Sequence, residues 1–139
     1  PVRDYESYSR EFEVEIDGTP ALKGSAAPPF RGLSHLHNPE DLLVAALSSC
    51  HCLSYLALCA RARIVVEAYE DDATGTMAFD RVAKVMRFTE VVLRPKVRLA
   101  AGADVDKARA LHENAHHECF IANSVNFPVR NEPTITVGG

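Results

Sequence analysis

The chain has 139 residues, of which 47% are hydrophobic and 24% charged, a balance that suits one globular domain over residues 1–139. The net charge of -4 and the lack of any basic block argue against a nucleic acid partner, and the longest apolar run, Leu42 to Leu47, is too short for a membrane span. The polar, acidic start and only four cysteines indicate no secretory signal and no disulfide scaffold, so we expect a cytoplasmic, reducing setting.

The first predicted element is a strand over residues 11–16. Phe12, Val14 and Ile16 alternate there with three glutamates, which is typical of a strand with one face buried. Asp17-Gly18 provides the turn chemistry that ends it. Residues 18–37 are rich in Gly, Pro, Ser and Ala without a clear period, so we expect a loop with one short strand near residues 21–23.

A long helix is predicted from residue 38 to about residue 61. Asn38 suits the N-cap, Pro39 the first helical position, and two acids the positive end of the helix dipole. No Lys, Arg, Asp or Glu occurs between Leu42 and Cys59. A helix that is apolar on all sides is enclosed by the rest of the protein or by a partner subunit.

The second half of the chain predicts several strands and a second helix. Asp104 caps that helix, which runs to about residue 117, and Pro128 ends a helical turn over residues 119–125. We expect the second helix to be amphipathic, with its histidines, His112, His116 and His117, on the surface. Strands are predicted at residues 64–69, 73–79, 82–87, 89–93, 97–99 (after a break at Pro95) and 134–137. The fold class is therefore α+β, built around one buried helix.

The four cysteines need not share one role. A free cysteine on an apolar helix is most often a small buried hydrophobe, which is our interpretation of Cys52 and Cys59. Cys50 differs, because Cys119 occupies a similar place on the second helix and has partly polar neighbours. If the two helices pack together, the two cysteines could be brought to disulfide distance.

The segment Cys50-His51-Cys52 also raises the question of a metal site. Cysteines two positions apart on a helix point about 200° away from each other, so they are poorly placed to share one ion. His112 and His116 share a helix face, but the sequence has no zinc-hydrolase pattern. We therefore predict no metal.

Two motifs carry a family resemblance. NPEDLLVAALSSC, followed much later by AHHECFIANSVNFPV, resembles the OsmC-like family, which includes osmotically inducible protein C and the organic hydroperoxide resistance proteins. The resemblance implies a mainly antiparallel sheet wrapped around a long central helix, in an intertwined homodimer. It also implies a thiol-dependent peroxidase that acts on organic hydroperoxides, needs no cofactor, and is restored by a thiol reductant that the sequence does not identify.

The resemblance further implies roles for individual residues. Cys50 would attack the peroxide and become a sulfenic acid, and Cys119 would resolve it as a disulfide. Because burial disfavours a thiolate, Cys50 needs a cationic neighbour. In the family that neighbour is an arginine held by the glutamate that matches Glu40; Arg31 is the first candidate and Arg10 the second.

The spacing of Glu40 and Cys50 bears on assembly. Ten residues of helix span about 15 Å, so the two side chains of one chain do not share a site. We expect a homodimer in which the arginine and glutamate of one chain reach Cys50 of the other. Three alternatives remain: Glu40 serves only the helix dipole, the protein binds a small apolar ligand without catalysis, or it is a redox sensor that uses the same two cysteines.

Overall fold

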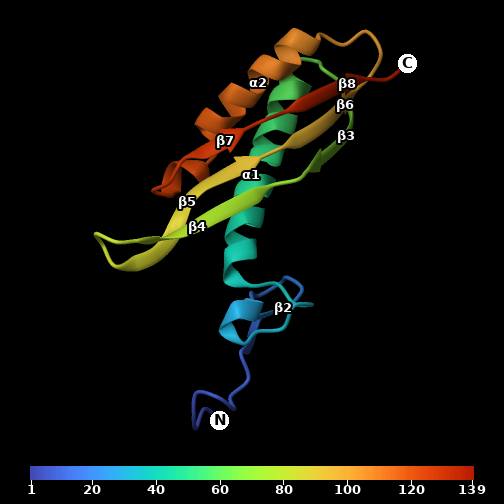
Figure 1. Ribbon diagram of the computed structural model, residues 1–139. Helices are drawn as coiled ribbons and strands as arrows, with labels where there is room; N and C mark the ends of the chain where they lie inside the picture. The colour runs from blue at the N-terminus through green and yellow to red at the C-terminus, as the bar shows by residue number, and fades with distance from the viewer. The chain divides into compact units, whose positions relative to one another are not determined.

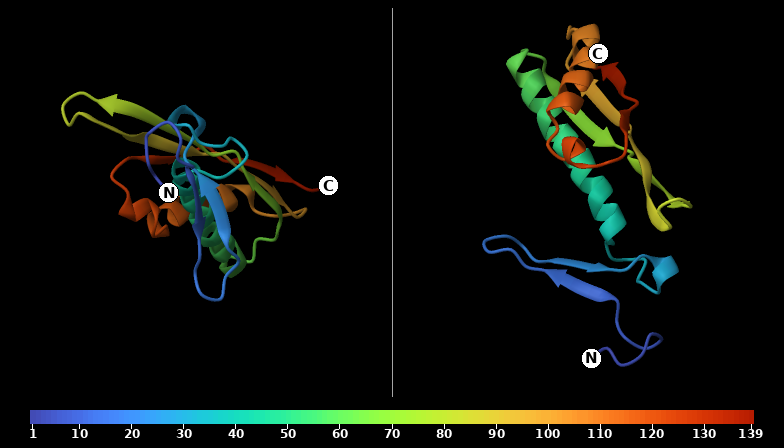
Figure 2. Two further views of the ribbon diagram at one scale, coloured as in Figure 1. Left: turned by 90° about the horizontal axis from the view of Figure 1, so that it is seen from below. Right: turned by 90° about the vertical axis from the view of Figure 1, so that its left-hand side faces the viewer.

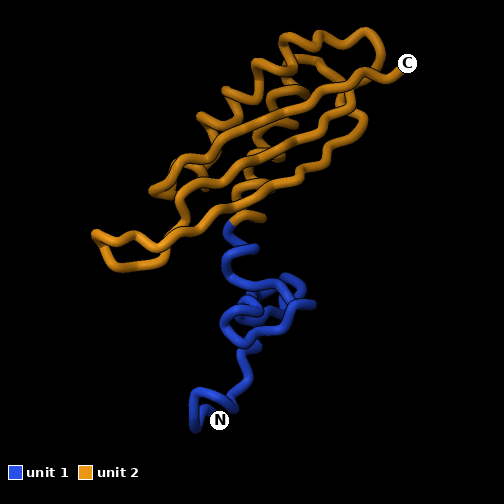
Figure 3. The backbone as a smooth tube through the Cα atoms, in the orientation of Figure 1, with its two compact units in different colours: residues 1–43 blue, residues 44–139 orange.

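The computed structural model describes residues 1–139, which form two compact units, residues 1–43 and 44–139 (Figure 3). The first unit contains an antiparallel hairpin of β1 (Glu11–Val14) and β2 (Leu22–Ser25), followed by a 3-10 turn, η1 (Pro28–Phe30). Both predicted strands are therefore present, although β1 ends before Ile16. Gly18 has a φ of 82°, which explains the glycine in the connecting turn.

Helix α1 (Pro39–Arg61) begins as the sequence predicts. The side-chain oxygen of Asn38 accepts a hydrogen bond from the backbone N–H of Asp41 at 2.8 Å, which confirms the N-cap. By length and composition alone α1 would suffice to cross a membrane, a test that buried core helices also pass.

Only one face of α1 is buried within this chain. The buried residues recur every fourth position, as one stripe of a helix does: Leu47, His51, Tyr55 and Cys59. Leu53, between them, is 70% exposed. The rest of the chain therefore does not enclose α1 on all sides.

The strands of the second unit form two three-stranded sheets, in the orders β3-β6-β8 and β4-β5-β7. Each strand of one sheet continues into a strand of the other after a short break: β3 into β4, β5 into β6 and β7 into β8. The two sheets are therefore formed by three long bent strands (Figure 1). The first and middle long strands are antiparallel, and the middle and last are parallel. Their bounds are β3 (Val66–Asp71), β4 (Thr74–Asp80), β5 (Val85–Leu93), β6 (Pro95–Leu99), β7 (Val129–Asn131) and β8 (Thr134–Val137).

The Asp71 side chain links α1, by hydrogen bonds, to the bend where the two sheets meet. One carboxylate oxygen accepts the backbone N–H of Arg94 at 2.7 Å, and the other accepts the hydroxyl of Ser48 on α1 at 2.5 Å. The predicted break at Pro95 is wrong in position, because Pro95 begins β6 and the break falls at Arg94. The sequence analysis also missed β7, which has only three residues and is held by its parallel pairing with β5.

Helix α2 (Val105–Glu118) lies in the chain between β6 and β7 and so connects the middle long strand to the last, which runs parallel to it. The Asp104 carboxylate accepts the backbone N–H of Lys107 at 3.0 Å, which confirms the predicted cap. A short 3-10 turn, η2 (Ala122–Ser124), follows the helix. Within this unit both helices lie on the same side of the strands (Figure 2), so the main core forms between α1, α2 and β6.

Candidate active site

The structure brings Cys50 and Cys119 into contact. Cys50 is half-buried on α1, and Cys119 is 1% exposed at the C-terminal cap of α2. Both thiols are free, and that of Cys119 donates a hydrogen bond to Cys50. Two residues that are 69 positions apart in the sequence (119 − 50) thus meet where the two helices pack together.

The surroundings of Cys50 favour its thiolate. Burial by itself raises the pKa of this thiol. Hydrogen bonds from the Ile121 backbone N–H, the Cys119 thiol and the Phe120 backbone N–H outweigh burial, so the pKa of Cys50 lies below its ordinary value. For Cys119 the direction is opposite: burial, and then the bond to Cys50, raise the pKa of its thiol. Cys50 is therefore the thiol that ionises first.

The donors to Cys50 come from the end of α2. The helix stops at Glu118, and Cys119 is extended, with a φ of -70° and a ψ of 111°. The backbone N–H groups of Phe120 and Ile121 lie between this end of α2 and the start of η2 at Ala122. The sulfur of Cys119 itself accepts the N–H of Ala122 at 3.4 Å. Sequence reasoning missed these donors, because backbone N–H groups leave no mark on residue identity.

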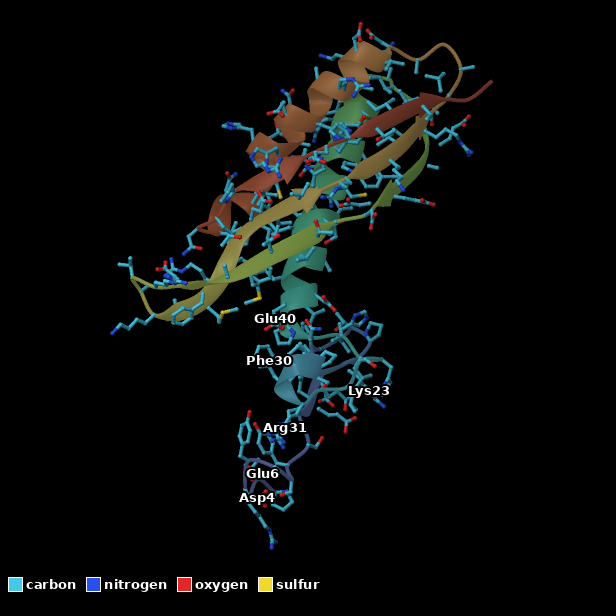
Figure 4. The ribbon with its side chains drawn as sticks, in the orientation of Figure 1. Asp4, Glu6, Lys23, Phe30, Arg31 and Glu40 are labelled. Carbon is cyan, nitrogen blue, oxygen red and sulfur yellow. The ribbon has the colours of Figure 1, made fainter.

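The remaining predicted residues belong to the first unit, where Figure 4 labels Glu40 and Arg31. One carboxylate oxygen of Glu40 is buried and has no hydrogen-bond partner. The Arg10 guanidinium lies 3.5 Å from the ring centroid of Tyr8, and the Arg10 and Arg31 guanidinium groups each lie 5.0 Å from that of Tyr5. The expected ion pair between Arg31 and Glu40 is not formed in this single chain, since the arginines stack on tyrosines instead.

Beside the cysteines lies a buried pair of histidines that the sequence analysis did not predict. His51 Nε2 and His112 Nδ1 are 3.0 Å apart, and the two residues are 1% and 2% exposed. The prediction that His112 lies on the surface is therefore wrong. Its position follows the buried stripe of α2, with Ala108 one turn before it and Ala115 near one turn after it. That spacing was the available signal.

The other two cysteines are poorer nucleophiles. Cys59 is buried and Cys52 half-buried, and burial raises the pKa of both thiols. Cys59 thus matches the prediction of a small buried hydrophobe. No group of three or more His, Cys, Asp or Glu side chains is placed to hold a metal ion.

An open groove of about 630 Å³ is lined by α1 from one turn beyond Cys50, by the end of α2 and by the segment that follows it. Neither Cys50 nor Cys119 lines this groove. Leu53 and Phe120 line it and are 70% and 80% exposed. Of the other phenylalanines, Phe30 is exposed, and Phe127 stacks on Phe88 with 5.4 Å between the ring centroids. Phe120 directly follows Cys119 in the chain.

Comparison with known proteins gives the family. A profile of OsmC-like proteins matches residues 32–134, well over half of the chain. This chain belongs to the OsmC-like family. The match includes α1 with Cys50 and extends past Cys119, so both thiols lie in the part shared with the family.

Solved OsmC-like structures agree with the fold. An OsmC-like protein of unknown function from Vibrio cholerae is 36% identical, covers 91% of this chain and 86% of its own, and superposes with a TM-score of 0.84. An organic hydroperoxide resistance protein from Legionella pneumophila is 17% identical, with coverage of 96% and 99% and a TM-score of 0.68. That of Bacillus subtilis is 15% identical, with coverage of 92% and 98% and a TM-score of 0.58. The last two share the fold alone, and no protein with a curated description matches.

Proposed function

We propose that this OsmC-like protein is a thiol-dependent peroxidase that reduces organic hydroperoxides to alcohols. The observation that carries the proposal is the Cys50 thiol, whose pKa is lowered by hydrogen bonds and which touches a second thiol, Cys119. A thiolate is the nucleophile in such chemistry, and an adjacent thiol protects its oxidised form. The names of the Legionella and Bacillus proteins, which refer to organic hydroperoxide resistance, support the same substrate class.

In the proposed first step, the Cys50 thiolate attacks the terminal oxygen of the hydroperoxide. The O–O bond breaks, its electron pair leaves with the alkoxide, and the alkoxide takes a proton to become the alcohol. Cys50 is oxidised by two electrons to a sulfenic acid. The half-buried position of Cys50 leaves the sulfur partly accessible to this substrate.

In the second step, Cys119 attacks the sulfur of the Cys50 sulfenic acid. The S–O bond breaks, a disulfide forms, and water leaves with the thiol proton. Because the negative charge on Cys50 is consumed in the first step, one cause of the raised pKa of Cys119 disappears. A thiol reductant must then return two electrons to the disulfide, and the reaction needs no bound cofactor.

We also propose that the active form is a homodimer. The exposed side of α1 presents Leu53 to solvent, and Phe120 is exposed next to Cys50. A second copy that covers this side would bury both residues, and its Arg31 and Glu40 would supply the cationic neighbour that Cys50 lacks here. Leu53→Glu is expected to sediment as a monomer while wild type sediments as a dimer, since burying an unpaired carboxylate is unfavourable. A monomeric wild type would contradict the dimer.

A variant of the second cysteine tests the proposed order of steps. In Cys119→Ser, the sulfenic acid on Cys50 is not resolved, so we expect one turnover of hydroperoxide and a product that dimedone traps on Cys50. Excess peroxide should then carry Cys50 on to sulfinic acid. Mass spectrometry of tryptic peptides checks both products. Turnover equal to wild type would remove Cys119 from the mechanism, and dimedone on another cysteine would remove Cys50 as the attacking thiol.

A further inference from the structure

The Arg31 side chain is held by an aromatic ring. Its guanidinium lies 5.0 Å from the ring centroid of Tyr5. Arg31 belongs to none of the ion pairs of the chain, and its side chain donates no hydrogen bond within the chain. Stacking uses the flat face of a guanidinium and leaves the N–H groups at its edge free. Arg31 is thus held in place while its donors stay open to another group.

The turn that carries Arg31 has a fixed backbone. Arg31 follows η1 in the left-handed region, with a φ of 65° and a ψ of 25°, which is uncommon for a residue other than glycine. The backbone N–H groups of Arg31 and Gly32 donate to the carbonyls of Pro28 and Ala27 at 3.1 and 3.2 Å. A Cβ on Gly32 would lie 1.5 Å from the Ala26 carbonyl oxygen, so this close approach requires glycine. Left-handed residues other than glycine cluster at functional sites.

A buried hydroxyl closes the same turn from inside. Ser25 is 0% exposed, and its hydroxyl donates to the carbonyl of Ala26 at 3.0 Å and accepts the N–H of Leu33 at 2.9 Å. Its backbone N–H donates to the carbonyl of His37 at 2.8 Å. Both sides of the turn are therefore tied to the end of β2. The freedom that remains to Arg31 is the direction of its long side chain.

Arg10, the other candidate for the cationic neighbour, uses its donors differently. Its guanidinium donates to the backbone carbonyls of Tyr5 and Tyr8 and also stacks on both rings. Arg10 is therefore occupied in holding the N-terminal segment that carries Tyr5. Of the two arginines, Arg31 is the one that is free to bind a group on another molecule.

A local turn adds to the order of this segment. The Asp4 carboxylate accepts the backbone N–H groups of Glu6 and Ser7 at 3.1 and 2.9 Å, and the Ser7 hydroxyl at 2.6 Å. The Tyr5 ring inside this turn remains 61% exposed, so burial does not account for its placement. Its contacts are with the two arginines and with Tyr8.

We propose that Tyr5 is a positioning residue for Arg31. The ring restricts the guanidinium to one direction, so that Arg31 meets Cys50 of a second copy with its N–H edge and with little further loss of side-chain freedom. Arg10 acts one step further away, by holding Tyr5. This inference rests on the proposed function, because it takes Arg31 to be the cationic neighbour of Cys50.

The test is the rate at which iodoacetamide alkylates Cys50 at pH 7 in the full chain, measured by mass spectrometry of the Cys50 peptide. This rate follows the thiolate fraction of Cys50 and requires no peroxide. Arg31→Gln removes the charge and should slow alkylation about tenfold. Tyr5→Leu removes only the ring and should slow it about two- to fivefold, as expected for an exposed cation–π contact. Tyr5→Phe keeps the ring and should react at the wild-type rate.

The double variant separates positioning from a general structural role. Because the ring acts only through the guanidinium, Tyr5→Leu combined with Arg31→Gln should be as slow as Arg31→Gln alone. The proposal is overturned if Tyr5→Leu reacts as wild type does, if Tyr5→Phe is as slow as Tyr5→Leu, or if the two effects add.

The same measurements distinguish this inference from the proposed function. If Arg31→Gln is slow and Tyr5→Leu is normal, the role of Tyr5 fails and the proposed role of Arg31 stands. If Arg31→Gln is normal, both roles fail. If the expected pattern of rates appears but the wild type reduces no hydroperoxide, the peroxidase fails and the positioning of Arg31 by Tyr5 stands.

Discussion

Replacing Cys50 with serine is expected to abolish hydroperoxide reduction. A serine hydroxyl does not ionise near pH 7, so the hydrogen bonds from Phe120, Ile121 and Cys119 have no thiolate to stabilise. We expect the rate of cumene hydroperoxide consumption, with dithiothreitol as reductant, to fall at least ~10³-fold, which corresponds to about 4 kcal/mol in activation free energy.

Cys52→Ser is the matched control for that variant. Cys52 lies two positions further along α1 and is half-buried like Cys50, but burial raises the pKa of its thiol. The control variant should keep activity close to wild type. If Cys52→Ser were as inactive as Cys50→Ser, the loss would reflect damage to α1 or a different nucleophile, and the role of Cys50 would fail.

Acid should destabilise the fold through the buried pair of His51 and His112. Burial lowers the pKa of the first to about 4 and of the second to about 3, against an ordinary value near 6.5. The charge of Asp71 opposes this shift at His51, while His116 adds to it there and Arg109 adds to it at His112. Each histidine is therefore neutral in the folded state where it would be charged in the unfolded state.

The sign of the pH dependence follows from the protons bound. Between pH 6.5 and about pH 4, the unfolded state binds more protons at His51 and His112 than the folded state does. The free energy of unfolding then falls as pH falls, by up to ~1.4 kcal/mol per pH unit for each histidine, and does not depend on the pair above about pH 7.

Urea denaturation from pH 7.5 to pH 4.5 measures this dependence. His112→Gln removes one titrating ring of the pair and should flatten the slope below pH 6.5. His117→Gln removes an exposed histidine of the same helix and should leave the slope unchanged. A slope that is equal in wild type and His112→Gln would contradict the neutral, buried pair.

Local features of the fold could be predicted because their signals are local. Asn38 and Asp104 cap their helices through atoms only three residues away. The buried stripe of α2 indicates that His112 is buried, but its pairing with His51, 61 residues away, could not be predicted from either segment alone. The strand β7 depends in the same way on its partner β5, because three residues carry too little pattern.

The candidate site was predictable in part. Cys50 and Cys119 could be paired because Cys50 lies on an apolar helix, Cys119 closely follows an amphipathic one, and the two helices must pack. The Phe120 and Ile121 donors could not be predicted, because they are backbone N–H groups whose direction is set by the way α2 ends. The role predicted for Arg31 depends on the assembly of two chains. Arg31 and Glu40 do not pair within the single chain, and their proposed role requires a second copy.

The most direct test of the central claim is to map disulfides after a single dose of substrate. The fully reduced protein receives one equivalent of cumene hydroperoxide, free thiols are blocked, and peptides are identified by mass spectrometry. We predict rapid formation of one disulfide, between Cys50 and Cys119, with Cys52 and Cys59 left reduced. Four free thiols, or slow oxidation without preference among them, would contradict the peroxidase and favour a protein whose cysteines are inert.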